Sequence, residues 1–219
     1  MVINHHPDDL LLLDYASGAL SEGWSLAVAT HIALCPPCRQ RKKHMEAIGG
    51  ALLEDEIPAS SAGLSFEYIE SKLNLQSDEI ASPTANQTIA QIPTLPEPLR
   101  GYLGTDLDGV DWRRLGVGAY QRLIPTGDPT TTVRLLRIPA GRPVPTHSHQ
   151  GMELTLVVDG SFSDSTGRYG RGDFQEADET LQHQPEAEAD KDCICLAITD
   201  GPLRFKSVAV RLAQPFLGI

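Results

Sequence analysis

The sequence predicts a two-domain α + β protein, with helices in the N-terminal part and an all-β C-terminal part. Through the first 75 residues, apolar side chains recur at the three- and four-residue spacing of helices. Residues 76–98 are rich in Pro, Ser, Thr and Gln without periodicity, as linkers are. After them, short β-prone runs alternate with Gly, Pro and Asp turns, which indicates a barrel or sandwich. We therefore predict domains at 1–75 and 99–219, joined by a linker at 76–98.

Each element of this prediction depends on a short pattern. Four helices are expected in the N-terminal domain, at residues 8–20, at 21–34, from the proline pair 36–37 onward, and at 64–75. A glycine pair at 49–50 weakens the third of them. The clearest C-terminal strands are expected within the runs TTVRLLRIP, ELTLVVDG, DCICLAIT and RFKSVAVRL.

Composition and charge exclude several classes of function. The 219 residues contain no apolar run of the roughly 18 residues that a spanning helix needs, and no basic segment of a signal peptide. We therefore expect a cytoplasmic protein. The net charge of −11 disfavours direct binding to nucleic acid or to an anionic membrane. Residues 1–98 carry 13 acidic and five basic side chains, so an acidic helical surface that suits a basic protein partner is expected there.

A cluster of metal-ligand residues lies in the stretch GRPVPTHSHQGMELTLVVDG. Residues two apart on a strand point to the same side, so His147 and His149 can face one metal ion. Glu153 shares that side if the turn around Gly151 keeps the register. The candidate for the fourth ligand is His183, about one hairpin downstream. This ligand set suits Zn, Fe, Mn, Cu or Ni and does not select among them.

The spacing of this cluster resembles the first motif of the cupin family. Gly141, five residues, the two histidines, three residues, Glu153, six residues and Gly160 match that motif at every position. The second motif is less regular: Gly172 and Asp173 precede His183, but the usual proline-glycine pair before the histidine and the asparagine after it are absent. The resemblance implies a small β-barrel with the metal inside it.

A second cluster lies in THIALCPPCRQ. His31 and Cys35 are four residues apart and share a helix face, and Pro36 ends that helix so that Cys38 returns toward them. In a reducing cytosol, this set favours structural zinc over a disulfide. A closed tetrahedral site needs a fourth ligand, for which His5 or His6 is the natural supplier and His44 a weaker candidate.

The two clusters together carry a second resemblance. The spacing from His31 through Cys35 to Cys38, with His6 twenty-five residues upstream, resembles the zinc-binding anti-sigma domain. Joined by a linker to a cupin, nearly the whole chain resembles a ChrR-type anti-sigma factor. The resemblance implies a cytoplasmic protein, not an enzyme, that sequesters a group IV (extracytoplasmic-function) sigma factor and releases it in response to singlet oxygen or related oxidants. The cupin metal, zinc or another divalent transition metal, would then serve sensing or architecture.

Two other functions are weighed against this one. The first is a cupin metalloenzyme, a dioxygenase or hydrolase with a helical accessory domain, which needs an open coordination position and a positioned base. The second is a metal-binding scaffold without a sigma partner. Cys193 and Cys195 share one face of an apolar strand and are expected to be small core residues, with oxidisable sensor thiols as the alternative.

Overall fold

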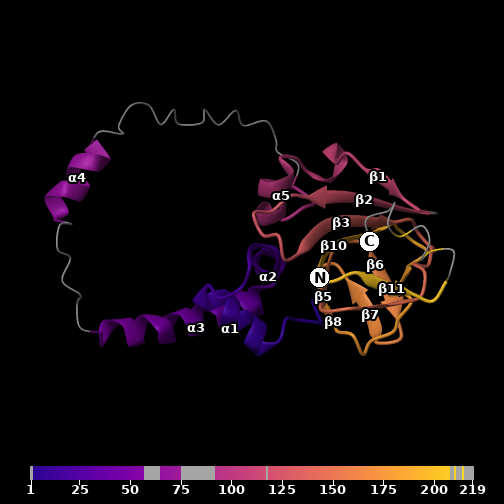
Figure 1. Ribbon diagram of the computed structural model, residues 1–219, viewed down its shortest axis with the longest axis horizontal. Coiled ribbons are helices and arrows are strands. Elements are labelled where there is room, and N and C mark those ends of the chain that lie inside the picture. Colours follow the sequence, from indigo (N-terminus) through magenta and orange to yellow (C-terminus); the bar gives the residue numbers. More distant parts are fainter. Residues whose placement is uncertain are drawn as a thin grey trace. The chain divides into compact units, whose positions relative to one another are not determined.

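The computed structural model describes residues 2–56, 65–74, 92–116, 118–207, 210 and 214 (Figure 1). The chain forms two compact units, one of Met1–Ala47 with Pro93–Ile219 and the other of Ile48–Ile92. The first unit therefore contains both the N-terminal helices and the strands. None of the helices in the described part of the chain combines the length and apolar character needed to cross a membrane.

Three helices open the chain, as predicted. They are α1 (Asp9–Ser17), α2 (Glu22–Leu34) and α3 (Pro36–Glu54). The side chain of Asp8 caps α1 by accepting a hydrogen bond from the Leu11 amide, and Gly18 ends it in the left-handed conformation, with φ of 74°. Cys35 separates α2 from α3 in an extended conformation, which the proline after it favours.

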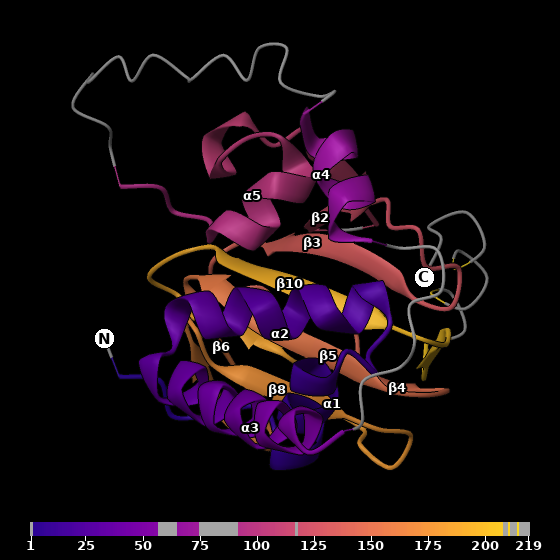
Figure 2. The same ribbon diagram turned by 90° about the vertical axis from the view of Figure 1, so that its left-hand side faces the viewer.

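Helix α2 is the central helix of the first unit and packs against the largest sheet (Figures 1 and 2). Its Leu26 and Ala27 belong to the main hydrophobic cluster, whereas Val28 and Ile32 pack with α1 and the start of α3. A side chain at Gly23 would overlap Thr131, so a glycine permits the close approach of helix and sheet.

The described residues of the C-terminal part form three antiparallel sheets, in keeping with the predicted cupin fold. The largest has the order β1-β2-β3-β10-β5-β8, with β1 (Arg113–Leu115), β2 (Ala119–Ile124), β3 (Thr132–Ile138), β10 (Cys193–Thr199), β5 (Glu153–Asp159) and β8 (Phe174–Ala177). The smaller sheets pair β11 (Leu203–Phe205) with β4 (His147–His149), and β7 (Gly167–Gly170) with β6 (Ser161–Asp164) and β9 (Glu186–Ala187). Among the described residues, no ladder joins them into one closed barrel.

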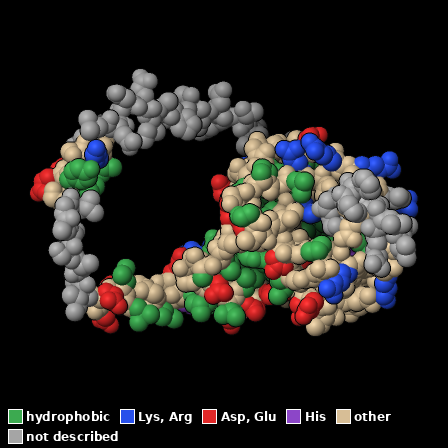
Figure 3. Space-filling view, viewed as in Figure 1, with side chains coloured by type: hydrophobic (Ala, Val, Ile, Leu, Met, Phe, Trp, Pro, Cys, Tyr) green, Lys and Arg blue, Asp and Glu red, His purple; other side chains and the backbone are tan. Residues whose placement is uncertain are grey.

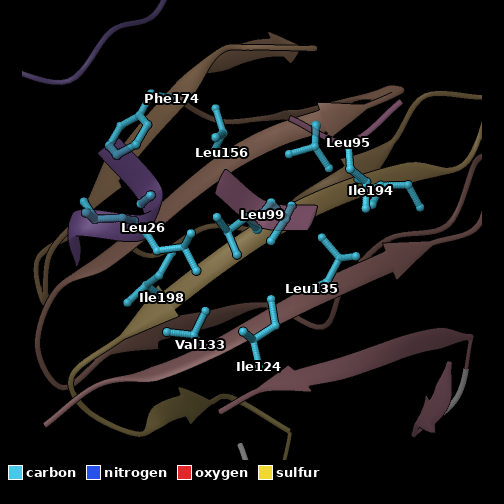
Figure 4. Close-up of a cluster of buried hydrophobic side chains, with 14 of the residues drawn as sticks. Leu26, Leu95, Leu99, Ile124, Val133, Leu135, Leu156, Phe174, Ile194 and Ile198 are labelled. Carbon is cyan, nitrogen blue, oxygen red and sulfur yellow. The ribbon is translucent and has the colours of Figure 1, made fainter. Parts of the chain in front are cut away.

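Strand β10 lies between two hydrophobic clusters, and its side chains pack alternately into one and the other. Ile194, Leu196 and Ile198 face the cluster shared with α2 (Figure 4). Cys193 and Cys195 face a second cluster with Val157 and Phe162, which places both cysteines in the core as expected. Because both faces of β10 are buried, its sequence contains the nearly continuous apolar run CICLAI.

The structure describes only the end of the predicted linker. Residues 76–91 lie outside the described residues, and the domain boundaries stay a prediction. The described end of the predicted linker is packed rather than extended, because Leu95 is buried in the main cluster. Helix α5 (Glu97–Leu103) follows and places Leu99 in the same cluster, and a short 3-10 helix, Leu107–Gly109, comes next. The C-terminal part therefore begins with helical turns.

Two further elements complete the comparison. Helix α4 (Phe66–Asn74) belongs to the second unit and confirms the predicted fourth helix. The run RFKSVAVRL is a strand only through Phe205, the last residue of β11, because Lys206 and Ser207 are in no strand. Residues 208, 209 and 211–213 of that run and its surroundings lie outside the described residues.

Two candidate metal centres

The structure brings the eight predicted ligand residues together in two groups of four. One group is His6, His31, Cys35 and Cys38, and the other is His147, His149, Glu153 and His183. Within each group, one possible ligand atom from every residue lies within 4.8 Å of the others. Spacing predicted each set, and the fold supplies the fourth member from a distant part of the chain.

The N-terminal group forms where α2 passes into α3. His31 lies in the last turn of α2, Cys35 follows that helix, and Cys38 lies in the first turn of α3. The N-terminal segment then brings in His6, whose Nδ1 is 3.4 Å from the Sγ atoms of both cysteines. Nitrogen and sulfur ligands of a tetrahedral zinc ion lie about 3.5 Å apart, given Zn–N of about 2.05 Å and Zn–S of about 2.3 Å. The spacing of these atoms fits such an ion.

His31 is arranged as a ligand by a hydrogen bond on the far side of its ring. Its Nδ1 donates to the carbonyl oxygen of Gly172 at 2.9 Å, which leaves the lone pair on Nε2. That Nε2 atom is buried and has no hydrogen-bond partner among the described residues. Burial also lowers the pKa of His31 to about 4, so the ring is neutral at physiological pH. A metal ion would satisfy the orphaned lone pair.

Burial acts in the opposite direction on the thiol of Cys38. Burial and the neighbouring Cys35 together raise the pKa of Cys38 to about 11. The Cys38 thiol and the His31 imidazole are therefore uncharged until a cation replaces the thiol proton. The donor set of two sulfurs and two imidazoles is that of closed structural zinc sites.

The two alternative suppliers of the fourth ligand lie elsewhere. The ring of His5 faces the strands, 4.3 Å from the ring of Tyr169, and its Nδ1 is 3.6 Å from the carboxylate of Asp173. His44 is exposed on α3 beside Gln40. Of the three candidates, only His6 reaches the cysteines in the part of the chain that the structure describes.

Backbone pairing builds the second group. His147 and His149 occupy the first and last positions of β4, and both are buried. His183 is paired with His147 through two backbone hydrogen bonds of 3.0 and 3.1 Å. Glu153 begins β5, so the turn around Gly151 keeps the register that its ligand role requires.

The hydrogen bonds of two histidines leave their Nε2 lone pairs facing each other. His147 Nδ1 donates to the carbonyl of Pro145 at 2.8 Å, and His183 Nδ1 donates to the carboxylate of Asp164 at 2.7 Å. The two Nε2 atoms are 3.1 Å apart, and His149 Nε2 is 3.2 Å from that of His183. Nitrogen ligands of tetrahedral zinc lie about 3.3 Å apart, given Zn–N of about 2.0–2.1 Å. Facing lone pairs repel unless a cation lies between them.

A proton is a poor substitute for that cation. Burial lowers the pKa values of His149 and His183, because an imidazolium loses its hydration in the interior. Glu153 supplies the negative charge, with one carboxylate oxygen 3.7 Å from His149 Nδ1 and the other accepting from the Thr155 hydroxyl at 3.0 Å. The arrangement fits a divalent metal held by three imidazoles and a carboxylate.

Three residues support these groups in roles that the sequence did not predict, although Gly172 and Asp173 were named in the second cupin motif. Asp164 orients His183, Gly172 orients His31, and Asp173 holds the N-terminal segment that carries His6. Only Asp164 left a local signal, since its carboxylate accepts from the amide and hydroxyl of Thr166 in an Asx turn. Gly172 and Asp173 support the N-terminal group through tertiary contacts, and the cupin motif does not reveal that role.

Replacing Asp164 with asparagine is expected to weaken metal binding at the cupin group by about 10- to 100-fold, because His183 loses the carboxylate that fixes its tautomer. Competition with a chromophoric chelator measures the effect. Asp128→Asn is the matched control, since Asp128 makes the same turn with Thr130 without contacting a histidine. Equal affinity in the wild type and Asp164→Asn would show that Asp164 does not support the metal site.

The fold and the two groups define a cupin protein with a second, thiolate-containing metal group in its N-terminal helices. The family model of the ChrR cupin-like domain matches residues 102–203. The chain is also 46% identical to the anti-sigma-E factor ChrR of Cereibacter sphaeroides, over 100% of both chains. It belongs to the ChrR family of anti-sigma factors, as its motifs predicted. The family is one of regulators, so the chain is not an enzyme and the metalloenzyme alternative is set aside.

A solved structure of a ChrR protein agrees with this assignment. The crystal structure of Rhodobacter sphaeroides SigE in complex with the anti-sigma ChrR matches with a TM-score of 0.77 and 45% identity, over 91% of this chain and 100% of that chain. An RmlC-like cupin protein from Ralstonia eutropha matches with a TM-score of 0.42 and 23% identity, over 48% of this chain and 71% of that one.

Proposed function

We propose that this protein is an anti-sigma factor that sequesters a group IV sigma factor. The observation that carries the proposal is the 46% identity with the anti-sigma-E factor ChrR over the full length of both chains. The similar ChrR structure was determined in complex with SigE. Binding with a Kd of about 1 nM is worth about 12 kcal/mol, so a signal that removes about 3–4 kcal/mol of it weakens binding several hundred-fold.

Two exposed apolar surfaces of the second unit support a protein partner. The end of α3 exposes Ile48, Leu52 and Leu53, each 65% or more accessible. Helix α4 exposes Phe66, Ile69 and Leu73 at the spacing of one helix face, between 47% and 74% accessible. Figure 3 shows hydrophobic side chains on both elements. Apolar surface of this kind marks protein interaction sites, and a helix with one apolar face suits a partner's groove.

The charge of this unit indicates the character of the partner. Glu54, Asp55 and Glu56 follow the apolar end of α3, and Glu67 and Glu70 flank the apolar face of α4. An apolar surface with an acidic border suits a partner whose contact surface is basic at its rim. We therefore assign these acidic residues of the second unit to sigma-factor binding.

Each metal group has its own proposed role. The residues His6, His31, Cys35 and Cys38 would hold a structural zinc ion that fixes the N-terminal segment, α2 and α3 to one another. The residues His147, His149, Glu153 and His183 would hold zinc or another divalent transition metal. We assign inhibition to the helical part, residues 1–75, and tuning of release to the cupin at 99–219. Singlet oxygen or a related oxidant in the cytoplasm is the proposed signal.

Co-purification tests the proposed function. The tagged chain is expressed together with a group IV sigma factor. It is expected to retain that sigma factor during purification and to inhibit transcription from a promoter that the sigma factor recognises. The double variant Ile69→Asp/Leu73→Asp should weaken binding by more than about 100-fold, since two apolar anchors of about 1.5–3 kcal/mol each are lost.

Ser71→Asp is the matched control for that variant. It adds one charge to the same helix on the face opposite Ile69 and Leu73, and should bind as the wild type does. A wild-type chain that neither retains a sigma factor nor inhibits its promoter would refute the proposed function. Equal binding by both variants would show that α4 is outside the interface.

A further inference from the structure

The N-terminal segment that carries His6 lies along an edge of the cupin sheet. Strand β8 is the last strand of the six-stranded sheet, so one side of its backbone is not paired within that sheet. The Phe174 amide donates to the carbonyl of His5 at 3.1 Å, and the Asp8 amide donates to the side chain of Glu176 at 2.9 Å. Residues 5–8 therefore follow β8 and cover part of this edge.

A single buried carboxylate holds the start of this segment. One oxygen of Asp173 accepts hydrogen bonds from the amides of Asn4 and His5 at 2.6 and 2.9 Å. The other oxygen accepts from the amide of Gly170 at 2.8 Å, which closes the turn between β7 and β8. Asp173 is only 3% exposed, so these charge-assisted bonds are made away from water. Two of them fix the backbone immediately before His6.

The neighbouring residue of the same turn holds a second ligand of the group. The carbonyl of Gly172 accepts from His31 Nδ1 at 2.9 Å and directs Nε2 toward the thiols. Gly172 has φ of 89°, and a side chain there would overlap Ile3. Consecutive residues of one cupin turn therefore orient both histidines of the N-terminal group. The two cysteines lie at the α2–α3 junction.

We propose that Asp173 is a positioning residue for the N-terminal metal site, and that the cupin turn Gly170–Phe174 thereby controls how firmly that site retains its metal. The inference rests on the proposed function of the site in holding zinc. Without the carboxylate, residues 2–6 regain backbone freedom, and ordering them again costs conformational entropy each time His6 binds. The His6 side chain then dissociates from the metal more often. A site with only three remaining ligands releases its metal faster.

The test uses the full chain with Asp173→Asn and the matched control Asp106→Asn. Asparagine is isosteric but presents one acceptor, so it cannot serve both Gly170 and the amides of Asn4 and His5. Asp106 makes the same kind of contact, accepting from the amides of Thr94 and Leu95 at 2.9 and 2.8 Å. Asn4→Pro removes one of the bonds from its donor side and leaves the cupin sequence intact.

Zinc release to excess chelator and cobalt substitution give the readouts. Thiolate-to-cobalt charge transfer reports the N-terminal site alone, because the cupin group contains no sulfur. We expect Asp173→Asn to release zinc about 10- to 100-fold faster and to alter the cobalt spectrum, with a smaller change in the same direction for Asn4→Pro. Asp106→Asn should match the wild type in both measurements.

The outcomes separate the inference from the proposed function. A wild-type chain without a thiolate–cobalt band, and without zinc at this site, would refute the metal site itself. A wild-type chain that holds zinc, with Asp173→Asn and Asn4→Pro both holding it equally well, would refute the positioning role. Faster release in Asp106→Asn to the same extent would also overturn it, because the effect would then be one of general stability.

Discussion

Replacing Cys35 with serine is expected to empty the N-terminal metal site and to release the sigma factor constitutively. The thiol of Cys35 lies 3.4 Å from His6 Nδ1 and is fully buried, so no water replaces it without rearrangement. Loss of an outer partner of a metal ligand already weakens binding by about 10- to 100-fold, and loss of a ligand itself should exceed that. Since metal binding contributes to folding in small metal domains, the helices should lose stability with it.

Metal content, thermal unfolding and reporter transcription together measure this effect. Zinc should fall by about one ion per chain, and transcription from the sigma-dependent promoter should rise to the level seen without the anti-sigma factor. Cys193→Ser is the control, because Cys193 is equally buried but lies in the second hydrophobic cluster, outside both metal groups. Full inhibition by a zinc-free double variant, Cys35→Ser with Cys38→Ser, would show that these cysteines have no part in inhibition.

Local patterns predicted much of the fold and three residues of each candidate ligand set. The helices were predictable because their apolar spacing and caps are local, and Pro36 marks the junction at which Cys35 and Cys38 meet. The cupin histidines were predictable because a strand places residues two apart on one side. Each of these features depends on residues close in sequence.

What could not be predicted depends on contacts between distant segments. The choice of His6 over His5 follows from the pairing of the N-terminal segment with β8, which turns the ring of His5 toward Tyr169. The packing of α2 against the sheet likewise depends on the fit of Gly23 beside Thr131. The burial of Leu95 in the predicted linker has the same origin, since a polar composition does not reveal one apolar residue that finds a core.

Alanine at Glu153 is expected to leave inhibition intact and to abolish release on oxidative challenge. The carboxylate is the only charged ligand of its group, so its loss should remove the cupin metal, about one ion per chain. The apolar surfaces assigned to sigma binding belong to the second unit, which contains none of these ligands. His147→Ala and His149→Ala should behave in the same way, because the Nε2 atom of each lies beside that of His183, at 3.1 and 3.2 Å.

The path by which the cupin group influences the rest of the first unit is short. Glu153 pairs with Ala177 at one end of β8, and Phe174 at the other end donates to His5 beside the N-terminal group. Strand β8 is four residues long, so a shift of Glu153 reaches the segment that holds His6 through one strand. Coupling of this kind requires an element that responds to both sites, and β8 contacts both.

Sigma-dependent transcription, measured with and without singlet oxygen, tests whether the cupin group is needed for release. In the wild type the signal should raise transcription, and in the Glu153→Ala chain the ratio of induced to basal transcription should fall close to one. Glu179→Ala removes an exposed carboxylate from the same region outside both metal groups and should respond as the wild type does. Normal induction in Glu153→Ala, His147→Ala and His149→Ala would remove the sensing role and leave the cupin metal a structural one. Constitutive transcription in all three would instead place the cupin metal in inhibition itself, because the helical part alone would then be insufficient to hold the sigma factor.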